Sequence, residues 1–179
     1  MSVRLETGRY FLRTLDETDA TERYLSWMRD PDVMRYLHAR FETHSLDSIR
    51  RYIAGHDNLT SFLIGVFCKE SGLHVGNYSA RCNPHHKTVE QGVLIGDRAH
   101  WGRGAVLETR AAVLDFLFDA QGMEKVCGNV YADNVASLFN YKAQGWRHEG
   151  TLVSHVKSGE GRCDVLCFAI SRDEWRARR

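Results

Sequence analysis

The sequence predicts a single α/β domain over residues 1–179, with a mixed, mostly antiparallel sheet and helices on both of its faces. A chain of this length fits one domain with one hydrophobic core. Strand-like runs at 61–68, 73–81 and 88–95 follow one another with short connections, which is typical of an antiparallel meander. A helical segment at 106–120 separates the run at 88–95 from another at 125–131. A helix between two strands predicts that they lie parallel, joined by a right-handed crossover.

The N-terminal part of the chain predicts a strand followed by three short helices. Residues 9–15 alternate well enough for the strand, and Asp16 and Asp19 are candidate N-caps for a helix through Met28. Pro31 breaks that helix and favours a second one that begins at the proline. Ser45 is a candidate N-cap for the third helix. The apolar face of that helix comprises Leu46, Ile49, Tyr52 and Ile53.

The C-terminal half predicts two helices and three strands. Gly122 is placed to end the helix at 106–120, and the strand at 125–131 follows. Asn134 is a candidate N-cap for a helix at 135–143, which Gly145 ends. Strands at 153–157 and 162–170 flank a turn at 158–161, and residues 171–175 are expected to form a short tail.

The composition argues against several classes of protein. The formal net charge is +1, so no global field attracts nucleic acid or an anionic membrane. An N-terminal signal region and an apolar run of membrane-spanning length are both missing, which predicts a cytoplasmic protein. The cysteines lack metal-site spacing, so we expect free thiols and no metal. They are Cys68, Cys82, Cys127, Cys163 and Cys167.

The stretch at 95–105 combines a strand end, a glycine-bearing loop and a helix start. Gly102 and Gly104 let the backbone come close to a ligand, and Arg98 and Arg103 add positive charge. The free N–H groups at a helix start favour an anion such as a pyrophosphate. The spacing of a P-loop is absent, and Leu107 stands where a dinucleotide fingerprint has its third glycine. A coenzyme pyrophosphate loop and a plain turn that uses glycine for its geometry remain as alternatives.

A second stretch agrees with the coenzyme alternative. The matching pieces are EQGVLIGD at 90–97, WGRG at 101–104, YADN at 131–134 and YKAQGW at 141–146. Together they resemble the GNAT superfamily of acetyl-CoA-dependent N-acetyltransferases, and most closely its RimJ/RimL-type branch and relatives in surface-polysaccharide gene clusters. The resemblance covers most of the chain and is strongest over 90–146. It implies a single N-acetyltransferase domain, with the parallel strands splayed at the coenzyme site.

The resemblance also implies which residues bind acetyl-CoA. The strand end should pair with the pantetheine arm through its backbone, the loop should hold the pyrophosphate, and Asn134 should contact the arm while capping its helix. The loop departs from the family pattern at Val106, where a smaller residue is usual and a β-branched side chain crowds the approach. The implied set is Val93, Leu94, Ile95, Trp101, Gly102, Arg103, Gly104, Ala105, Val106, Asn134 and Tyr141.

Two residues are candidates for the proton transfers. Tyr141 occupies the family position of a tyrosine that protonates the leaving thiolate; its alternative is a core tyrosine with a satisfied hydroxyl. Glu90 is the candidate base for the acceptor ammonium, although a glutamate on an alternating strand is also typical of the solvent face. His155 is the alternative base. A Ser-His-Asp order and a nucleophile elbow are both missing, which favours direct transfer over an acyl-enzyme.

The resemblance suggests a primary amine as the acceptor, with the amino group of a nucleotide-linked sugar first. Tyr36, Arg40 and Phe41 lie in the helical region that covers the acceptor side in such chains; packing in the core is the alternative for the two aromatic residues. A protein N-terminus is the second candidate acceptor. A non-catalytic acyl-CoA-binding module is the alternative interpretation of the whole chain. The expected partner is a small amine, not nucleic acid or membrane, and a homodimer is one of the oligomeric states left open.

Overall fold

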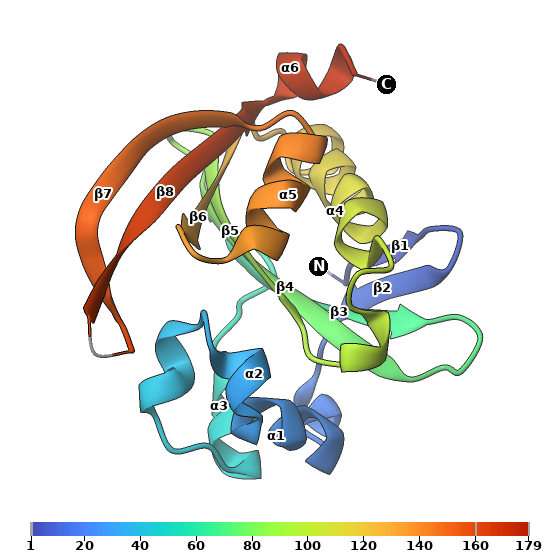
Figure 1. The fold of residues 1–179 in the computed structure, drawn as a ribbon. Helices are drawn as coiled ribbons and strands as arrows, with labels where there is room; N and C mark the ends of the chain where they lie inside the picture. The colour runs from blue at the N-terminus through green and yellow to red at the C-terminus, as the bar shows by residue number, and fades with distance from the viewer. Residues whose placement is uncertain (1, 160, 179) are drawn as a thin grey trace. The chain divides into compact units, whose positions relative to one another are not determined.

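The computed structural model describes residues 2–159 and 161–178, and within them one mixed sheet of eight strands has the order β1-β2-β3-β4-β5-β6-β8-β7 (Figure 1). β5 and β6 pair in parallel, from Thr88 opposite Lys125 to Glu90 opposite Cys127. The β1–β2, β2–β3, β3–β4, β6–β8 and β7–β8 pairs are antiparallel. The predicted α/β class, with a mostly antiparallel sheet and a parallel pair, is confirmed.

The bounds of the elements are as follows. The strands are β1 (Arg4–Glu6), β2 (Tyr10–Thr14), β3 (Ser61–Cys68), β4 (His74–Asn83), β5 (Thr88–Ile95), β6 (Lys125–Tyr131), β7 (Arg147–Ser158) and β8 (Gly161–Ser171). The α-helices are α1 (Glu22–Arg29), α2 (Pro31–Met34), α3 (Leu46–Ala54), α4 (Ala105–Asp115), α5 (Val135–Ala143) and α6 (Arg172–Arg176).

The described residues form two compact units. One comprises the chain up to Arg81 together with Val93–Val113, and the other comprises Cys82–Gly92 together with the chain from Leu114 onward. β4, β5 and α4 each contribute residues to both units. A single N-acetyltransferase domain over residues 1–179 stays a prediction.

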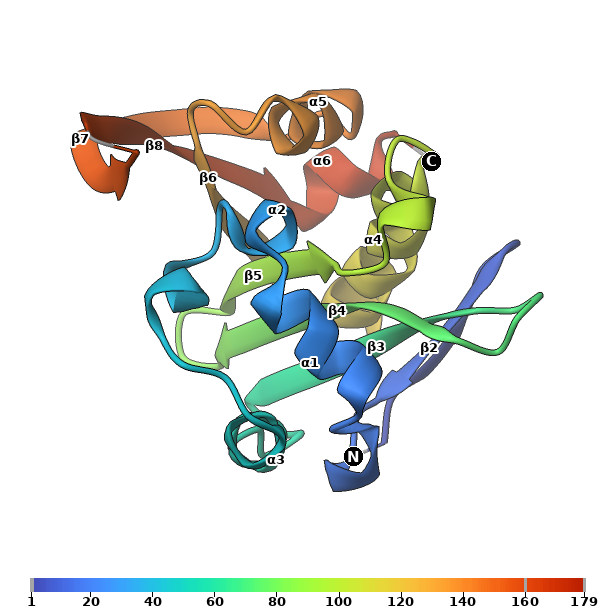
Figure 2. The same cartoon turned by 60° about the horizontal axis from the view of Figure 1, so that its bottom comes forward.

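The first unit has helices on both faces of its strands. Leu63 and Phe67 of β3 join a buried cluster with Trp27 of α1 and Ile49 of α3. The opposite face carries Tyr78 of β4, whose hydroxyl lies 2.9 Å from the Thr109 hydroxyl of α4. Figure 2 shows α1 in front of β3 and β4, and α4 behind them. The loop at 96–104 therefore leads directly into a helix that packs on the sheet.

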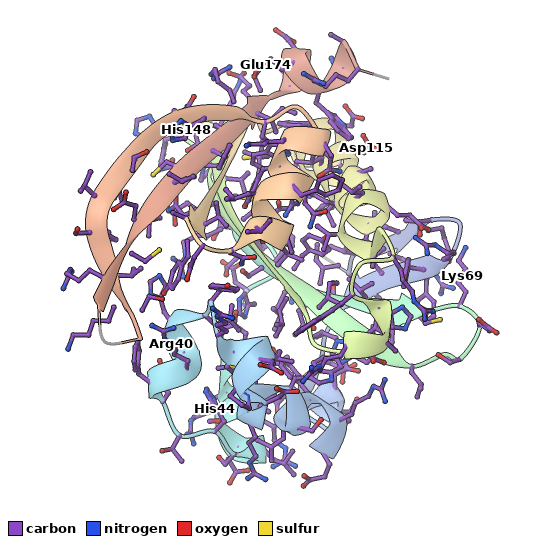
Figure 3. The ribbon with its side chains drawn as sticks, in the orientation of Figure 1. Arg40, His44, Lys69, Asp115, His148 and Glu174 are labelled. Carbon is purple, nitrogen blue, oxygen red and sulfur yellow. The ribbon has the colours of Figure 1, made fainter. Side chains whose placement is uncertain are left out.

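The second unit packs α5 and α6 against its strands and the end of α4. The Tyr141 ring of α5 stacks on the Phe168 ring of β8, with centroids 4.9 Å apart. Trp175 of α6 donates its indole N–H to the Asp115 carboxylate at 2.8 Å. Glu174 of α6 forms an ion pair with Arg147 of β7, and Figure 3 labels both Asp115 and Glu174. The expected tail at 171–175 is wrong, because Ser171 and Glu174 form a capping box that starts α6.

The structure corrects the expected start of the first helix. Asp16 is the N-cap of a short 3₁₀ helix at Glu17–Asp19, and Asp16 and Asp19 form its capping box. The C-cap of this short helix is Ala20. α1 instead begins after Thr21, whose hydroxyl accepts from the Tyr24 N–H. Asp16 and Asp19 are therefore not caps of α1. The proline start of α2 and the Ser45 cap of α3 are confirmed.

Candidate active site

The strand end of β5 turns its backbone polar groups to alternate edges. The N–H groups of Gly96 and Asp97 both donate to the Val75 carbonyl, at 3.0 and 3.1 Å. The Leu94 carbonyl also faces β4, since a Cβ at Gly76 would lie 2.4 Å from it. Because strand backbones alternate, Val93 presents its N–H and C=O to the edge away from β4. Val93 is thus better placed than Leu94 to pair with an extended ligand.

Trp101 folds back on the same strand end. Its indole N–H donates to the Ile95 carbonyl at 2.7 Å, and its ring is partly exposed. The Arg98 guanidinium lies 5.3 Å from the Trp101 ring centroid and forms an ion pair with Asp32 at 2.7 Å. The charge of Arg98 is therefore balanced by α2, whereas Arg103 is exposed on the loop.

Backbone conformation explains the loop glycines. Gly102 and Gly104 have φ of +68° and +73°, the left-handed region in which side chains are strained. A Cβ would meet no atom within 4 Å at Gly102, and at Gly104 the nearest is Arg9 Nη2 at 3.8 Å. α4 starts at Ala105, so the loop ends at free helical N–H groups. A positively polarised helix start that follows these uncrowded glycines suits an anion.

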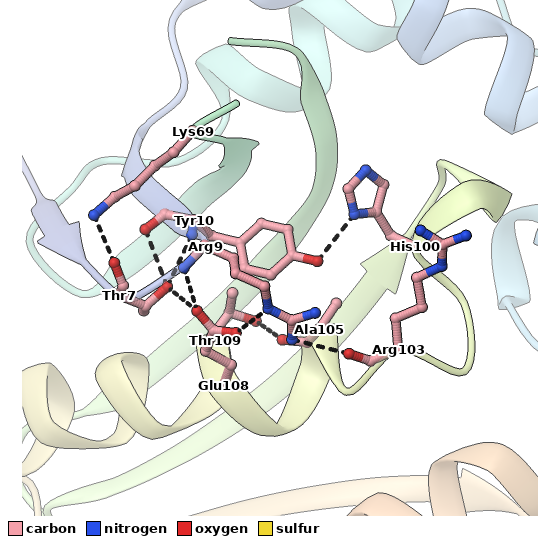
Figure 4. Close-up of polar contacts among 9 residues, drawn as sticks. All are labelled: Thr7, Arg9, Tyr10, Lys69, His100, Arg103, Ala105, Glu108 and Thr109. Atoms are coloured by element: carbon pink, nitrogen blue, oxygen red, sulfur yellow. Dashed lines mark hydrogen bonds and ion pairs between the residues drawn. The ribbon is translucent and has the colours of Figure 1, made fainter. Parts of the chain in front are cut away.

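A hydrogen-bond network from β2 and the turn before it holds the loop and the start of α4 (Figure 4). The Glu108 carboxylate accepts from the Thr7 hydroxyl, the Arg9 N–H and the Arg9 guanidinium, each at 2.7 Å. The same guanidinium donates to the Arg103 carbonyl at 2.9 Å. The Tyr10 hydroxyl hydrogen-bonds His100 Nδ1 at 2.9 Å. The loop conformation is therefore maintained by contacts from the N-terminal hairpin.

The same network balances the charge of Glu108. Burial alone would raise the pKa of this carboxyl, but the hydrogen bonds from Arg9 and Thr7 outweigh burial and lower it. The pKa of Arg9 is raised by its hydrogen bond to Glu108. A carboxylate in the first turn of α4 would otherwise oppose an anion there. The Arg9 cation removes that opposition.

In the second unit, Asn134 and Tyr141 lie two turns apart on α5. The Asn134 side-chain oxygen accepts from the Ser137 N–H at 3.1 Å, which confirms the predicted N-cap. Tyr141 is 4% exposed, stacks on Phe168 and meets the edge of the Trp146 ring at a centroid distance of 4.9 Å. Packing therefore leaves its ring little freedom to move.

The Tyr141 hydroxyl lies directly over Gly128 of β6. A Cβ at Gly128 would be 2.2 Å from the hydroxyl oxygen and 2.9 Å from Cζ. Glycine at this position therefore makes room for the phenol group. The hydroxyl is positioned by two independent features, the stacked rings around Tyr141 and the missing side chain beneath it.

Glu90 lies on the other face of β5, exposed, in register with Cys127 of β6. Burial raises the pKa of the Cys127 thiol, and the charge of Glu90 adds to that effect. Lys125 is two residues from Cys127 on the same face and pairs with Glu149 at 2.7 Å. His155, the alternative base, is exposed on β7, and its carbonyl accepts from the Arg162 guanidinium at 3.0 Å.

The candidate acceptor residues form paired cations and rings in the segment 35–41. Arg40 is labelled in Figure 3; its guanidinium lies 4.6 Å from the Phe41 ring centroid and donates to the Arg35 carbonyl at 2.6 Å. Arg35 lies 5.2 Å from the Tyr36 ring centroid. Phe41 is 70% exposed, so it does not pack in the core. The segment offers an accessible aromatic ring beside positive charge.

The described residues give no sign of a metal centre or a membrane span. Within 2–159 and 161–178, no group of three or more His, Cys, Asp or Glu could hold a metal ion. No helix in the same ranges has the length and apolar character needed to cross a membrane. The five cysteines all lie in these ranges and are free thiols there.

Comparison with known proteins decides the family. The Acetyltransferase (GNAT) domain model matches residues 9–146. The chain belongs to the GNAT acetyltransferase family. The N-acetyltransferase p20 of Bacillus licheniformis, described as uncharacterized, is 24% identical over 179 residues and covers 96% of this chain and 97% of its own. This GNAT chain is therefore an acetyl-CoA-dependent N-acetyltransferase.

Solved acetyltransferases share the fold. A RimL ribosomal L7/L12 alpha-N-protein acetyltransferase in complex with coenzyme A superposes with a TM-score of 0.84 at 17% identity, covering 96% of this chain and 99% of that one. The spermidine N-acetyltransferase of Vibrio cholerae, in complex with coenzyme A and spermine, gives 0.82 at 21% identity, covering 94% and 98%. The GNAT fold expected from the sequence is thus confirmed.

Sequence reasoning about this N-acetyltransferase missed three residues that the structure makes prominent. Gly128 carried a signal, because glycine inside a strand often marks a close approach. Gln91 also carried a sequence signal, because it is a polar residue in phase with the apolar Val89 and Val93 of an alternating strand. The structure shows that this position is buried. Arg9 carried none, since its contacts to Arg103 and Glu108 are separated from it by more than ninety residues.

Proposed function

We propose that this N-acetyltransferase moves the acetyl group directly to the primary amine of a nucleotide-linked amino sugar. The observation that carries the proposal is the pairing of Arg40 with the exposed Phe41 ring. A guanidinium beside an accessible aromatic ring suits a ligand with both a planar base and phosphates. A nucleotide-linked sugar has both groups, and its amino group is the acetyl acceptor.

The charge of the same segment argues against a polycationic acceptor. The Arg40 guanidinium donates to the Arg35 backbone carbonyl, so both arginines add positive charge to one short segment. Two guanidinium groups repel a polyamine and attract a diphosphate. The V. cholerae relative is a spermidine N-acetyltransferase, so an acceptor of opposite charge would separate the two proteins.

The residues present fit acetyl-CoA, which supplies the acetyl group as an activated thioester. In the first unit, Gly102, Gly104 and the first N–H groups of α4 would hold the pyrophosphate, with Arg103 adding charge. Val93 would pair with the pantetheine arm through its backbone, as its orientation away from β4 supports. In the second unit, Asn134 would contact the arm from the start of α5.

The chain's own groups would perform the proton transfers. Glu90, exposed on β5, would accept a proton from the acceptor ammonium, so that a neutral amine attacks. Tyr141 would hold a proton for the departing thiolate, with its hydroxyl fixed over Gly128. Rigid packing of the ring supports this role because a proton donor must be placed accurately.

A panel of amines tests the acceptor. Thiol release from acetyl-CoA is measured with a nucleotide-diphosphate-linked amino sugar, the free amino sugar, spermidine and a peptide with a free α-amino group. We expect the highest kcat/KM for the nucleotide-linked sugar. Arg40→Ala should raise KM for that acceptor about tenfold and leave the free sugar unaffected. Arg50→Ala, an exposed arginine paired with Asp47 on α3, serves as the control.

Preference for the peptide would make the chain a protein N-terminal acetyltransferase instead. Preference for spermidine would contradict the inference that the positive charge of Arg35 and Arg40 disfavours a polycationic acceptor. Binding of acetyl-CoA without thiol release in the presence of any of the amines would favour a non-catalytic acyl-CoA-binding module.

A further inference from the structure

Gln91 of β5 is a buried side chain with an unusual hydrogen-bond status. It is 6% exposed, yet neither its amide oxygen nor its amide nitrogen has a hydrogen-bond partner within the described residues. Most buried polar side-chain atoms in proteins have such a partner, and leaving one unpaired costs free energy. An apolar side chain of similar length would fill the same space without that cost.

The strand register places Gln91 on the same sheet face as the proposed proton donor. Val89 of β5 is opposite Val126 of β6, and both are fully buried. Gln91 and Gly128 each follow two residues later, so they share that face of their strands. The Tyr141 hydroxyl lies over Gly128. Glu90, between Val89 and Gln91, faces the opposite way.

We propose that the Gln91 side-chain amide binds an amide group of the pantetheine arm of acetyl-CoA. The arm contains secondary amides, each with one N–H donor and one carbonyl acceptor. The Gln91 side chain offers the complementary carbonyl and NH₂ group. The inference rests on the proposed coenzyme site and assigns it a side-chain contact within the second unit. Gln91 would thus destabilise the free protein and be satisfied by the coenzyme.

The test uses two opposite effects of the Gln91 amide, which lowers the stability of the free protein and strengthens binding of the coenzyme. Gln91→Met keeps the length of the side chain and removes the amide. We expect a higher melting temperature without ligand and about tenfold weaker binding of acetyl-CoA in calorimetry without an acceptor. S-acetylpantetheine should lose affinity by the same factor, whereas adenosine 3′,5′-bisphosphate, which lacks the arm, should bind as it does to the wild type.

A control variant and three separate outcomes decide whether Gln91 contacts the coenzyme. Thr88→Val removes a hydroxyl from the same strand with little change of shape, and it should leave acetyl-CoA affinity unchanged. A Gln91→Met protein that is more stable and binds acetyl-CoA normally would overturn the contact. A less stable Gln91→Met protein would show an amide paired within the fold and would also overturn it. Failure of the nucleotide-linked sugar as acceptor, with affinity lost in Gln91→Met, would refute only the proposed acceptor.

Discussion

Gly128→Ala is the smallest change that displaces the proposed proton donor. The added Cβ would lie 2.2 Å from the Tyr141 hydroxyl oxygen, 2.9 Å from Cζ and 3.1 Å from Cε1. An ordinary contact begins at 3.4 Å, so the hydroxyl must move by about 1.2 Å. The ring is stacked on Phe168 and bordered by Trp146, so it cannot move without disturbing both.

The expected magnitude follows from that displacement. Overpacking of a well-packed core costs about 1–3 kcal/mol, which lowers the melting temperature by roughly 2–12 °C in a chain of this size. A misplacement of about 1 Å at a catalytic group can reduce the rate by about 10²-fold. We therefore expect kcat of Gly128→Ala to fall by about 10²-fold, while KM for acetyl-CoA changes little.

The assay compares thiol release with thermal stability in matched variants. Gly150→Ala is the control, because a Cβ there meets no atom within 4 Å. In a Tyr141→Phe background, Gly128→Ala should reduce kcat little further, since the hydroxyl that it displaces is already gone. A folded Gly128→Ala protein with wild-type kcat would refute the link between Gly128, the hydroxyl and turnover.

The remaining predictions concern other residues of the site. Tyr141→Phe should lower kcat by about 10²-fold and leave acetyl-CoA affinity unchanged; normal turnover where chemistry limits the rate would reassign Tyr141 to packing. Glu90→Gln should be slow at neutral pH and recover as pH rises and free amine accumulates; a pH profile equal to that of the wild type would exclude Glu90 as the base, and His155→Ala would follow. Gly104→Asp should weaken acetyl-CoA binding at least tenfold in calorimetry, whereas Gly72→Asp, at a similar φ of +68° in a turn, should not. The pKa of Glu108 is lowered in the folded protein, so its charged form stabilises the fold above its unfolded pKa and this effect is lost as pH falls. The difference in melting temperature between wild type and Glu108→Gln should therefore disappear below roughly pH 4. A difference that stays constant with pH would contradict the pairing with Arg9.

Local sequence signals predicted the elements that have strong local determinants. The runs at β3, β5 and β6 were predicted with the bounds found, because apolar strand residues end at turns. The α5 bounds were also predicted, since Asn134 caps the helix and Gly145 takes a φ of +71° after it.

Elements that depend on partners were missed or shortened. β1 has three residues and is a strand because it pairs with β2, so no periodicity marks it. β7 was predicted at 153–157 but begins at Arg147, because most of its residues are exposed and show no alternation. The helix predicted at 106–120 starts at Ala105 and ends as a π-helix at Phe116–Ala120, a change of winding without a sequence signature.

The candidate site shows the same division. The Asn134 cap was predicted from the local sequence and is confirmed, whereas the coenzyme roles of Asn134 and Tyr141 come from the resemblance and stay predictions. The space over Gly128 and the unpaired amide of Gln91 depend on neighbouring strands, which spacing along the chain does not reveal. The contacts of Arg9 with Glu108 and Arg103 could not be predicted, because they depend on how the N-terminal hairpin packs against α4.

Direct acetylation of an amine is tested most directly by following thiol release from acetyl-CoA before and after an acceptor is added. Wild-type protein is mixed with acetyl-CoA alone, its intact mass is recorded, and the nucleotide-linked amino sugar is then added. Direct transfer predicts no thiol burst and no acetylated protein in the first stage, followed by thiol release matched one for one by N-acetylated sugar. A burst equal to the enzyme concentration, with one acetyl group gained by the protein, would contradict direct transfer.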